Sequence, residues 1–214
     1  MDKFVTFEGV EGAGKSTLVK NLCDYLQKNH INFKCVREPG GSKVCEQIRN
    51  IVKYSEEPIS YQTELLLFSA SRAQLVSNVI LPQLAKGKIV ICDRFYDSSR
   101  VYQGYANGIS DDVVMQITSF ATNGLVPTVT FVLDIEPTFA FNRKGGRDKG
   151  DRIEAKDIKF HQKVRQGYLD IAQKESRFVV LDATKTEQEL LDIVVEKLKR
   201  ENILWWIILK RFTI

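Results

Sequence analysis

Short apolar runs recur along the chain and are separated by polar or turn-forming residues. Five of them, at residues 4–7, 33–36, 89–92, 129–134 and 178–182, are rich in Val, Ile, Leu or Phe. Runs of this length and composition are typical of buried strands. The run at 89–92 has no polar interruption, which is typical of a parallel strand covered on both faces.

Between these runs, apolar residues recur at helical spacing. Leu18, Leu22 and Leu26 lie on one face of a predicted helix that ends near Asn29. Further helices are predicted at 44–52, 61–87 (disturbed at Pro82), 110–124 and 154–175, with a short one through Phe141 and a last one from Thr186. Because strands and helices alternate, we expect one α/β domain over residues 1–214, with a parallel sheet covered by helices on both faces.

Residues 9–16 read Gly-Val-Glu-Gly-Ala-Gly-Lys-Ser and fit the pattern G-x-x-x-x-G-K-[ST] between a predicted strand and a helix. In such a P-loop the backbone N–H groups and the helix N-terminus favour phosphate, Lys15 adds a positive charge, and Ser16 can bind Mg²⁺. The alternative is a glycine-rich turn that merely precedes a helix. The predicted fold class is therefore a P-loop NTPase-type, doubly wound, five-stranded parallel sheet. The residues predicted to hold the nucleotide through this loop are Gly9, Gly12, Ala13, Gly14, Lys15, Ser16 and Thr17.

Charged residues follow directly after two of the predicted strands, as Arg37-Glu38 and Asp93-Arg94. Ligands of parallel α/β sheets bind at the carboxyl ends of the strands. A hydroxyl acceptor would require a positioned base, whereas a phosphate acceptor is already anionic near neutral pH and requires cations. The second case fits better, because arginines fall at strand ends, in loops or on loop-facing helices, at Arg37, Arg49, Arg72, Arg94, Arg143, Arg147 and Arg152.

The composition changes this picture little. The net charge of +4 is mild for a chain of 214 residues and does not require a nucleic-acid partner. Four cysteines without C-x-x-C spacing and two histidines argue against a zinc site. Cys35 and Cys92 lie in strand-like runs and are expected to be small buried thiols. We expect no signal peptide and a cytoplasmic location.

A charged, glycine-rich stretch at 143–152 interrupts the alternation of strands and helices. It is either a solvated surface loop or a mobile, arginine-bearing lid of about residues 143–153 over a nucleotide.

Several motifs together resemble bacterial thymidylate kinase. They are FEGVEGAGKST at 7–17, REPGG at 37–41, TELLLF at 63–68 with Arg72, DRFYDSS at 93–99 with YQG at 102–104, DRIE at 151–154 and LDAT at 181–184. This resemblance implies the five-stranded fold, the reaction of ATP with dTMP to give ADP and dTDP, a requirement for Mg²⁺, and a homodimer.

The resemblance also implies roles for individual residues. Glu11 would bind the 3′-hydroxyl of dTMP, Phe68 would stack on thymine, and Arg72, one helical turn on, would reach its O4. Ser99 would meet the base edge, with Gln103 nearby, and Tyr102 would crowd C2′ and disfavour ribonucleotides.

The phosphate and metal ligands follow from the same resemblance. Arg49 and Arg94 would hold the acceptor phosphate, with Glu38 and Asp93 beside them for the metal and for orienting the arginines. Ser16 would complete the metal ligands. Lys15 and Arg94 are candidate catalytic cations, and since the loop 11–13 has no arginine, the catalytic arginine would come from the lid, with Arg147 preferred to Arg143. Asp182 and Ala183 would lie against the adenine.

Other interpretations of these residues stay open. Phe68 fits an ordinary core helix, and Arg37 could simply pair with Glu38. Residues 184–187, Thr-Lys-Thr-Glu, faintly resemble a guanine-binding T-K-x-D, which would indicate a GTP-dependent switch protein. The D-x-x-G motif expected in such a protein after the third strand is absent from this sequence, where Asp93-Arg94-Phe95-Tyr96 stands instead. A kinase of another mononucleotide, or of a nucleoside, is a further alternative.

The apolar run at 203–209 departs from the family pattern and is too short to span a bilayer. It is expected to pack on the protein or on a dimer mate, with a partner or a membrane surface as alternatives.

Overall fold

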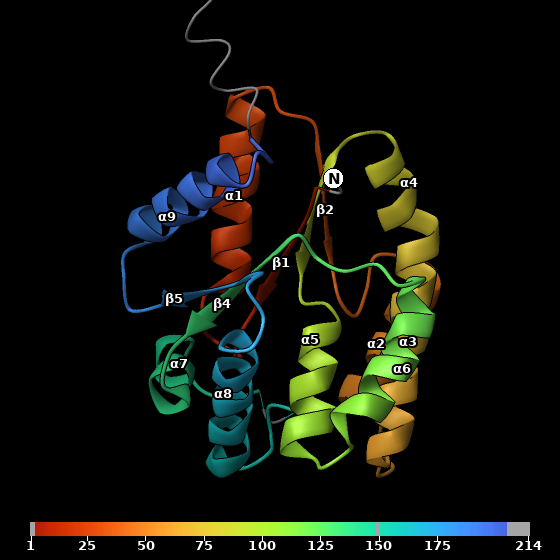
Figure 1. The fold of residues 1–214 in the computed structure, drawn as a ribbon. Coiled ribbons are helices and arrows are strands. Elements are labelled where there is room, and N and C mark those ends of the chain that lie inside the picture. The colour runs from red at the N-terminus through yellow and green to blue at the C-terminus, as the bar shows by residue number, and fades with distance from the viewer. Residues whose placement is uncertain (1–2, 149, 205–214) are drawn as a thin grey trace, which may run out of the picture.

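A computed structural model describes residues 3–148 and 150–204 of the chain. A sheet of five parallel strands lies at its centre, in the order β2-β3-β1-β4-β5 (Figure 1). The strands are β1 (Phe4–Glu8), β2 (Phe33–Arg37), β3 (Ile89–Asp93), β4 (Val129–Asp134) and β5 (Phe178–Asp182). Both edges of β1 are paired, with Val5 opposite Ile91 of β3 and Val129 of β4. The predicted fold class is confirmed.

Helices cover both faces of the sheet. They are α1 (Lys15–Lys28), α2 (Lys43–Tyr54), α3 (Tyr61–Leu75), α4 (Leu81–Ala85), α5 (Tyr96–Ser99), α6 (Asp111–Thr122), α7 (Pro137–Arg143), α8 (Ile158–Ala172) and α9 (Glu187–Arg200). α1 and α9 lie side by side, and α2, α3 and α6 form a group on the other side of the sheet (Figure 1). Val5 of β1 packs in the core that includes residues of α1 and α9, whereas the adjacent Phe4 packs with Leu75 of α3.

The long helix predicted at 61–87 is interrupted before Pro82. Between α3 and α4 lies a π-helical segment, η1 (Val76–Ile80), which ends shortly before Pro82 of α4, a residue that has no backbone N–H to donate to the preceding turn. Among the described residues, only the run Tyr61–Ala85 is long and apolar enough to cross a membrane. Because α3 packs against α2 and α6 and carries buried Arg72, we interpret this run as a core helix.

The helices differ from the prediction in two further places. Residues 96–106 form α5 and a second π-helical segment, η2 (Arg100–Ala106), where no helix is predicted. The helix expected at 154–175 begins only at Ile158, because Asp157 caps it by accepting the N–H of Phe160 at 2.7 Å. The preceding residues form turns, in which Asp151 accepts the N–H of Ile153.

The prediction for Cys35 is wrong, and that for Cys92 is confirmed. Cys92 lies on the inner strand β3 and is buried, but Cys35 lies on the edge strand β2 and is exposed. At the other end of the chain, Ile203 and Leu204 are buried in the core, as expected. The rest of the apolar run, at 205–209, lies outside the described residues.

Candidate active site

The P-loop joins β1 to α1 and depends on two close backbone contacts. Gly9 and Gly12 have positive φ angles of 135° and 77°. A Cβ atom on Gly9 would lie 2.6 Å from the carbonyl oxygen of Leu133, and one on Gly12 would lie 2.4 Å from that of Ala140. Glycine is therefore required for both the dihedral angle and the space.

Lys15, the first residue of α1, is buried at the centre of this loop. Its Nζ donates to the carbonyl oxygens of Gly9 at 3.0 Å and Val10 at 2.8 Å. Burial, together with the positive charge of Arg94, lowers the pKa of Lys15 to about 8. The ammonium group is thus held in place before a phosphate arrives.

Two clefts meet at the P-loop. The larger group of predicted site residues lines a cleft of about 270 Å³, which we call the arginine cleft. Its predicted members are Glu11, Gly12, Lys15, Ser16, Arg37, Glu38, Arg49, Phe68, Arg72, Asp93, Arg94, Ser99, Tyr102 and Gln103. The second, of about 440 Å³, we call the P-loop cleft, and its predicted members are Gly12, Ala13, Gly14, Lys15, Ser16, Thr17 and Arg143. Gly12, Lys15 and Ser16 line both.

The boundary between the clefts carries oxygen ligands suited to a divalent cation. Ser16 Oγ donates to Asp93 Oδ2 at 2.7 Å, and the buried Oε1 of Glu38 has no hydrogen-bond partner among the described residues. No group of three or more His, Cys, Asp or Glu side chains in the described part of the chain is placed to hold a metal by itself. Mg²⁺ typically takes one or two carboxylates and completes its shell with water and substrate phosphates.

Glu11 and Arg94 form an ion pair in the arginine cleft, with Nη2 of Arg94 2.9 Å from Oε1 of Glu11. Tyr102 donates its hydroxyl to both oxygens of the same carboxylate. Nδ1 of the buried His161 lies 3.6 Å from Glu11 Oε2. Burial alone would raise the pKa of Glu11, but Arg94, His161 and Lys15 outweigh it and hold this pKa well below its usual range.

Arg72 of α3 is only 1% exposed and is held at three points. It donates to Glu38 at 2.8 Å, to Ser99 Oγ at 3.1 Å and to the carbonyl oxygen of Phe95 at 3.2 Å. Burial raises the pKa of Glu38 to about 7, against the opposing charge of Arg72. Phe68, one turn before Arg72, is half-buried and lines the same cleft.

The alternative pair of Arg37 with Glu38 does not form. Arg37 bonds to Glu46 of α2 at 3.0 Å, because Glu38 turns inward to Arg72. Arg49 of α2 donates to the carbonyl oxygen of Pro39 at 3.0 Å and faces the cleft.

The two arginines of the predicted lid that are candidates for catalysis lie in different places. Nη2 of Arg143 donates to the carbonyl oxygen of Gly12 at 2.8 Å, and its Nη1 donates to that of Ala183 at 3.0 Å. Arg147 instead donates to the carbonyl oxygen of Lys156 and lies 6.0 Å above the ring of Phe141. It lines neither cleft.

Asp182 lies next to Ala183 at the end of β5. Its Oδ1 accepts the N–H of Thr184, and it lines neither cleft. The stretch with a faint likeness to T-K-x-D forms the cap of α9, where Thr186 and Glu189 make a reciprocal capping box.

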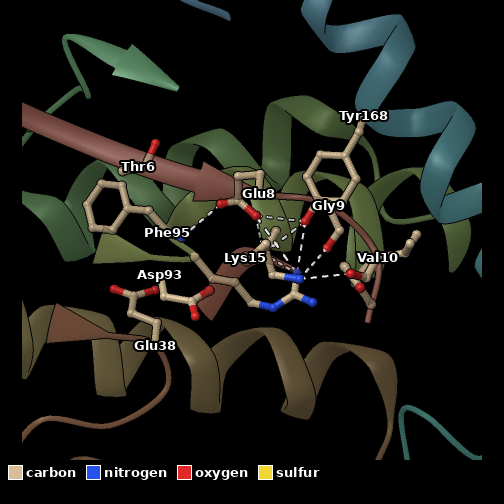
Figure 2. A network of polar contacts seen from close by, with 12 residues as sticks. Thr6, Glu8, Gly9, Val10, Lys15, Glu38, Asp93, Phe95 and Tyr168 are labelled. Atoms are coloured by element: carbon tan, nitrogen blue, oxygen red, sulfur yellow. Dashed lines mark hydrogen bonds and ion pairs between the residues drawn. The ribbon is translucent and has the colours of Figure 1, made fainter. Parts of the chain in front are cut away.

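Several residues at the site were not assigned from the sequence. Glu8 and Tyr168 lie against the base of the P-loop (Figure 2). The ion pair of Lys53 with Asp151 lines the arginine cleft. Glu8 directly precedes Gly9 at the end of an apolar strand. A carboxylate in such a position requires hydrogen-bond partners, and this could have identified Glu8 from the sequence.

Comparison with known proteins agrees with this geometry. A family model of thymidylate kinase matches residues 7–194. The thymidylate kinase of Finegoldia magna is 42% identical over 202 residues, covering 94% of this chain and 100% of that protein. That of Caldanaerobacter subterraneus subsp. tengcongensis is 46% identical over 192 residues, covering 89% and 90%. The crystal structure of thymidylate kinase from Ehrlichia chaffeensis aligns with a TM-score of 0.74 at 32% identity, covering 91% of this chain and 97% of that one. The chain therefore belongs to the thymidylate kinase family and is a nucleoside monophosphate kinase.

Proposed function

We propose that this chain transfers the γ-phosphoryl group of ATP to the phosphate of dTMP, with dTMP in the arginine cleft and ATP in the P-loop cleft. Family membership gives the reaction, and one observation supports this placement. Gly12, Lys15 and Ser16 line both clefts, so a donor in one and an acceptor in the other would meet at the P-loop. Phosphoryl transfer depends chiefly on such positioning and on neutralising charge.

The acceptor end of the reaction calls for cations. The second pKa of a phosphate monoester is ~6, so the attacking oxygen is anionic near neutral pH. In our proposal Arg94 and Arg49 hold this phosphate against the repulsion of the donor phosphates. Both line the arginine cleft, and Arg94 is fixed there by Glu11.

The nucleoside of dTMP would occupy the rest of the arginine cleft. Phe68, Arg72, Ser99 and Gln103 all line this cleft. Phe68 would supply a stacking surface, Arg72 and Ser99 would face the base edge, and Gln103 would lie nearby. Glu11 would exchange its bond from Tyr102 for the 3′-hydroxyl, while the ring of Tyr102 crowds C2′.

In the P-loop cleft, Lys15 and Thr17 would hold the ATP phosphates and Arg143 would lie over the loop. Asp182 and Ala183 would lie near the adenine. Ser16, Asp93 and Glu38 would hold Mg²⁺ directly or through water, because the first two are already hydrogen-bonded and the third has an unpaired buried oxygen. When bound, Mg²⁺ neutralises charge that develops on the transferred group. Arg147 would swing to the same group from the lid.

We also propose a homodimer that acts in the cytoplasm. The helices α3 and α6 pack together and carry the exposed apolar side chains of Leu66 (56% exposed), Val113 (44%) and Phe120 (89%). A contiguous exposed apolar patch marks a candidate interface, and in our proposal these side chains form one across the two helices. Sedimentation velocity of the purified chain tests the assembly, and a monomer at all accessible concentrations would contradict it.

A coupled assay of ADP production tests the reaction. With Mg²⁺ and ATP fixed, dTMP is the expected best acceptor, dUMP a poorer one and UMP much poorer. Preference for AMP, GMP or free thymidine in the same panel would refute the proposal.

A further inference from the structure

Glu8 is a buried carboxylate for which the reaction described above has no use. It is the last residue of β1, directly before the P-loop, and is 0% exposed (Figure 2). Burial raises the pKa of its carboxyl group against the attraction of Arg94. A carboxylate in such surroundings requires full hydrogen bonding.

Both carboxylate oxygens of Glu8 accept hydrogen bonds from other elements. Oε1 accepts the backbone N–H of Phe95 at 2.8 Å. Oε2 accepts the hydroxyl of Ser98 at 2.6 Å and that of Tyr168 in α8 at 2.7 Å. The side chain of Glu8 thus joins β1 to α5 and α8.

The two hydroxyl groups pass this orientation on to Arg94. Nη1 of Arg94 lies 3.2 Å from both Ser98 Oγ and Tyr168 Oη. A hydroxyl has one hydrogen to donate and two lone pairs that accept. Because both hydroxyls donate to Glu8, their lone pairs are free to accept from the arginine. The two hydroxyl oxygens also lie 3.0 Å apart. When both hydroxyls donate to the negatively charged Glu8, neither has a hydrogen left for the other, and both face Arg94 as acceptors.

The backbone of Arg94 also depends on this cluster. Its φ angle is 68°, in the left-handed region that costs energy for a residue with a Cβ atom. The N–H of Arg94 donates to the carbonyl oxygen of Phe7 at 2.9 Å, and the next N–H, that of Phe95, donates to Glu8. Two successive bonds to β1 hold the turn in this conformation.

We propose that Glu8 is a positioning residue that fixes both the strained turn at Arg94 and the direction of its guanidinium toward the acceptor phosphate. This inference rests on the proposed role of Arg94 in binding dTMP. If so, β1 acts at both substrates, because the strand that leads into the donor-binding P-loop also orients the arginine that would bind the acceptor phosphate.

Glutamine at position 8 has nearly the same shape but cannot make the same bonds. Its single oxygen can serve either the N–H of Phe95 or the two hydroxyls. If the amide NH₂ faces the hydroxyls, they must accept from it, and their hydrogens then point toward Nη1 of Arg94, which is itself a donor. Glu8→Gln should therefore misdirect Arg94 without emptying space in the core.

Isothermal titration with dTMP and with thymidine separates this role from general destabilisation, because only dTMP carries the phosphate that Arg94 would hold. For Glu8→Gln we expect Kd for dTMP to rise by roughly 10- to 100-fold, the usual effect of losing a hydrogen bond to a charged group. Kd for thymidine should stay unchanged. Tyr168→Phe, which removes one of the two accepting hydroxyls and leaves Glu8 in place, should shift Kd for dTMP in the same direction by less.

Thr6→Val is the matched control, since it removes a buried hydrogen bond of the same strand, the 2.8 Å contact with Thr130, without touching Arg94. It should leave both Kd values as they are. If Glu8→Gln keeps the parent's ratio of the two Kd values, the inference is wrong. If that variant does not fold, an unchanged ratio in Tyr168→Phe overturns it equally. Parent protein that binds thymidine as tightly as dTMP would instead refute the proposed function together with this inference.

Discussion

Ser16 Oγ donates a hydrogen bond of 2.7 Å to Oδ2 of Asp93, although the two residues are 77 positions apart in the chain. Ser16 lies in the first turn of α1, and Asp93 ends β3, the strand next to β1. Because parallel strands end at the same edge of the sheet, the P-loop and the carboxyl end of β3 meet there. We infer that Ser16 and Asp93 together hold Mg²⁺, directly or through water.

Replacing Asp93 by Asn should raise the Mg²⁺ concentration needed for activity while leaving the fold intact. The amide keeps the shape of the side chain but lacks its negative charge, so the metal loses a charged partner. Loss of such a partner costs about 10–100-fold in metal affinity or activity. The measurement is the rate of ADP formation against Mg²⁺ concentration at fixed ATP and dTMP.

Asp134→Asn is the control for this change. Asp134 also ends a strand, β4, but it pairs with Arg165 and lines neither cleft. It should keep the parent's Mg²⁺ curve. An Asp93→Asn enzyme with that same curve would exclude Asp93 from the metal site.

The pH dependence of ATP use should reflect Lys15. Its pKa is lowered to about 8, so the free enzyme has the charged ammonium below that pH and loses it above. We therefore expect kcat/KM for ATP, which follows groups of the free enzyme, to fall above pH ~8. Bound phosphates favour the charged form, so kcat at saturating ATP should hold to higher pH. A kcat/KM profile that stays flat up to the ordinary lysine range of ~10.4 would contradict this.

The strands could be predicted from the sequence because each is a short apolar run closed by a charge or a turn. The runs at 129–134 and 178–182 match β4 and β5 at both ends. The charges that end β2 and β3 fall where a parallel sheet gathers its ligands, and Glu38 and Arg94 do line one cleft. Here local pattern and tertiary arrangement agree.

The rest depends on contacts between distant residues, which local spacing does not reveal. The π-helical turns of η2 bring Tyr102 and Gln103 into the cleft, yet residues 96–106 have no regular helical pattern of apolar positions. The partner of Glu38 is Arg72, 34 residues later, and not the adjacent Arg37. Cys35 looks buried in its apolar run, but β2 is at the edge of the sheet.

The ion pairs around Asp97 should contribute to stability. Asp97 is 0% exposed and accepts from Arg177 at 2.7 and 2.8 Å, and Arg100 lies 3.4 Å away. Asp97→Asn leaves these largely buried arginines with less compensating charge, although Glu175 remains close to both and Asp111 to Arg100. Breaking a buried pair from one side costs ~3–5 kcal/mol, and we expect a loss of free energy of unfolding near the lower end.

Urea denaturation followed by circular dichroism measures this loss. Asp24→Asn serves as the control, since it breaks the exposed pair of Asp24 with Lys20 and should change the unfolding midpoint very little. Equal midpoints for the two variants would show that the Asp97 network does not stabilise the fold.

Arg147 should act on the charge that develops during transfer, although in the structure it bonds to the carbonyl oxygen of Lys156. Arg147→Ala should therefore lower kcat by roughly 10²–10³-fold, as expected for one preorganised charge contact, with KM for both substrates little changed. Steady-state kinetics with dTMP and ATP varied in turn measures both effects. If kcat of this variant equals that of the parent, Arg147 is not the catalytic arginine. Arg143, which already lies on the P-loop, would then be the candidate, or no lid arginine would have this role.

Selection of thymine should depend on Arg72 rather than on Phe68. An apolar pocket separates bases that differ by a methyl group by only about 1–3 kcal/mol, and stronger selection needs a polar group left unpaired by the wrong base. Arg72 uses three N–H groups on Glu38, Ser99 and Phe95, so two of the five that a guanidinium carries remain for O4 of thymine. Cytosine presents an amino group at this position, and two donors would then face each other.

The comparison is the ratio of kcat/KM for dTMP to that for dCMP. Arg72→Ala by itself would leave the charge of Glu38 buried and unpaired, so we place it in a Glu38→Gln background and compare it with Glu38→Gln alone. The added Arg72→Ala change should remove most of the preference for dTMP, because the donor that rejects cytosine is gone. Phe68→Ala should weaken both monophosphates evenly, since stacking does not distinguish the two pyrimidines. A ratio that is unchanged by the loss of Arg72 would remove this residue from base recognition, and a ratio that collapses in Phe68→Ala would give the selection to the stacking surface instead.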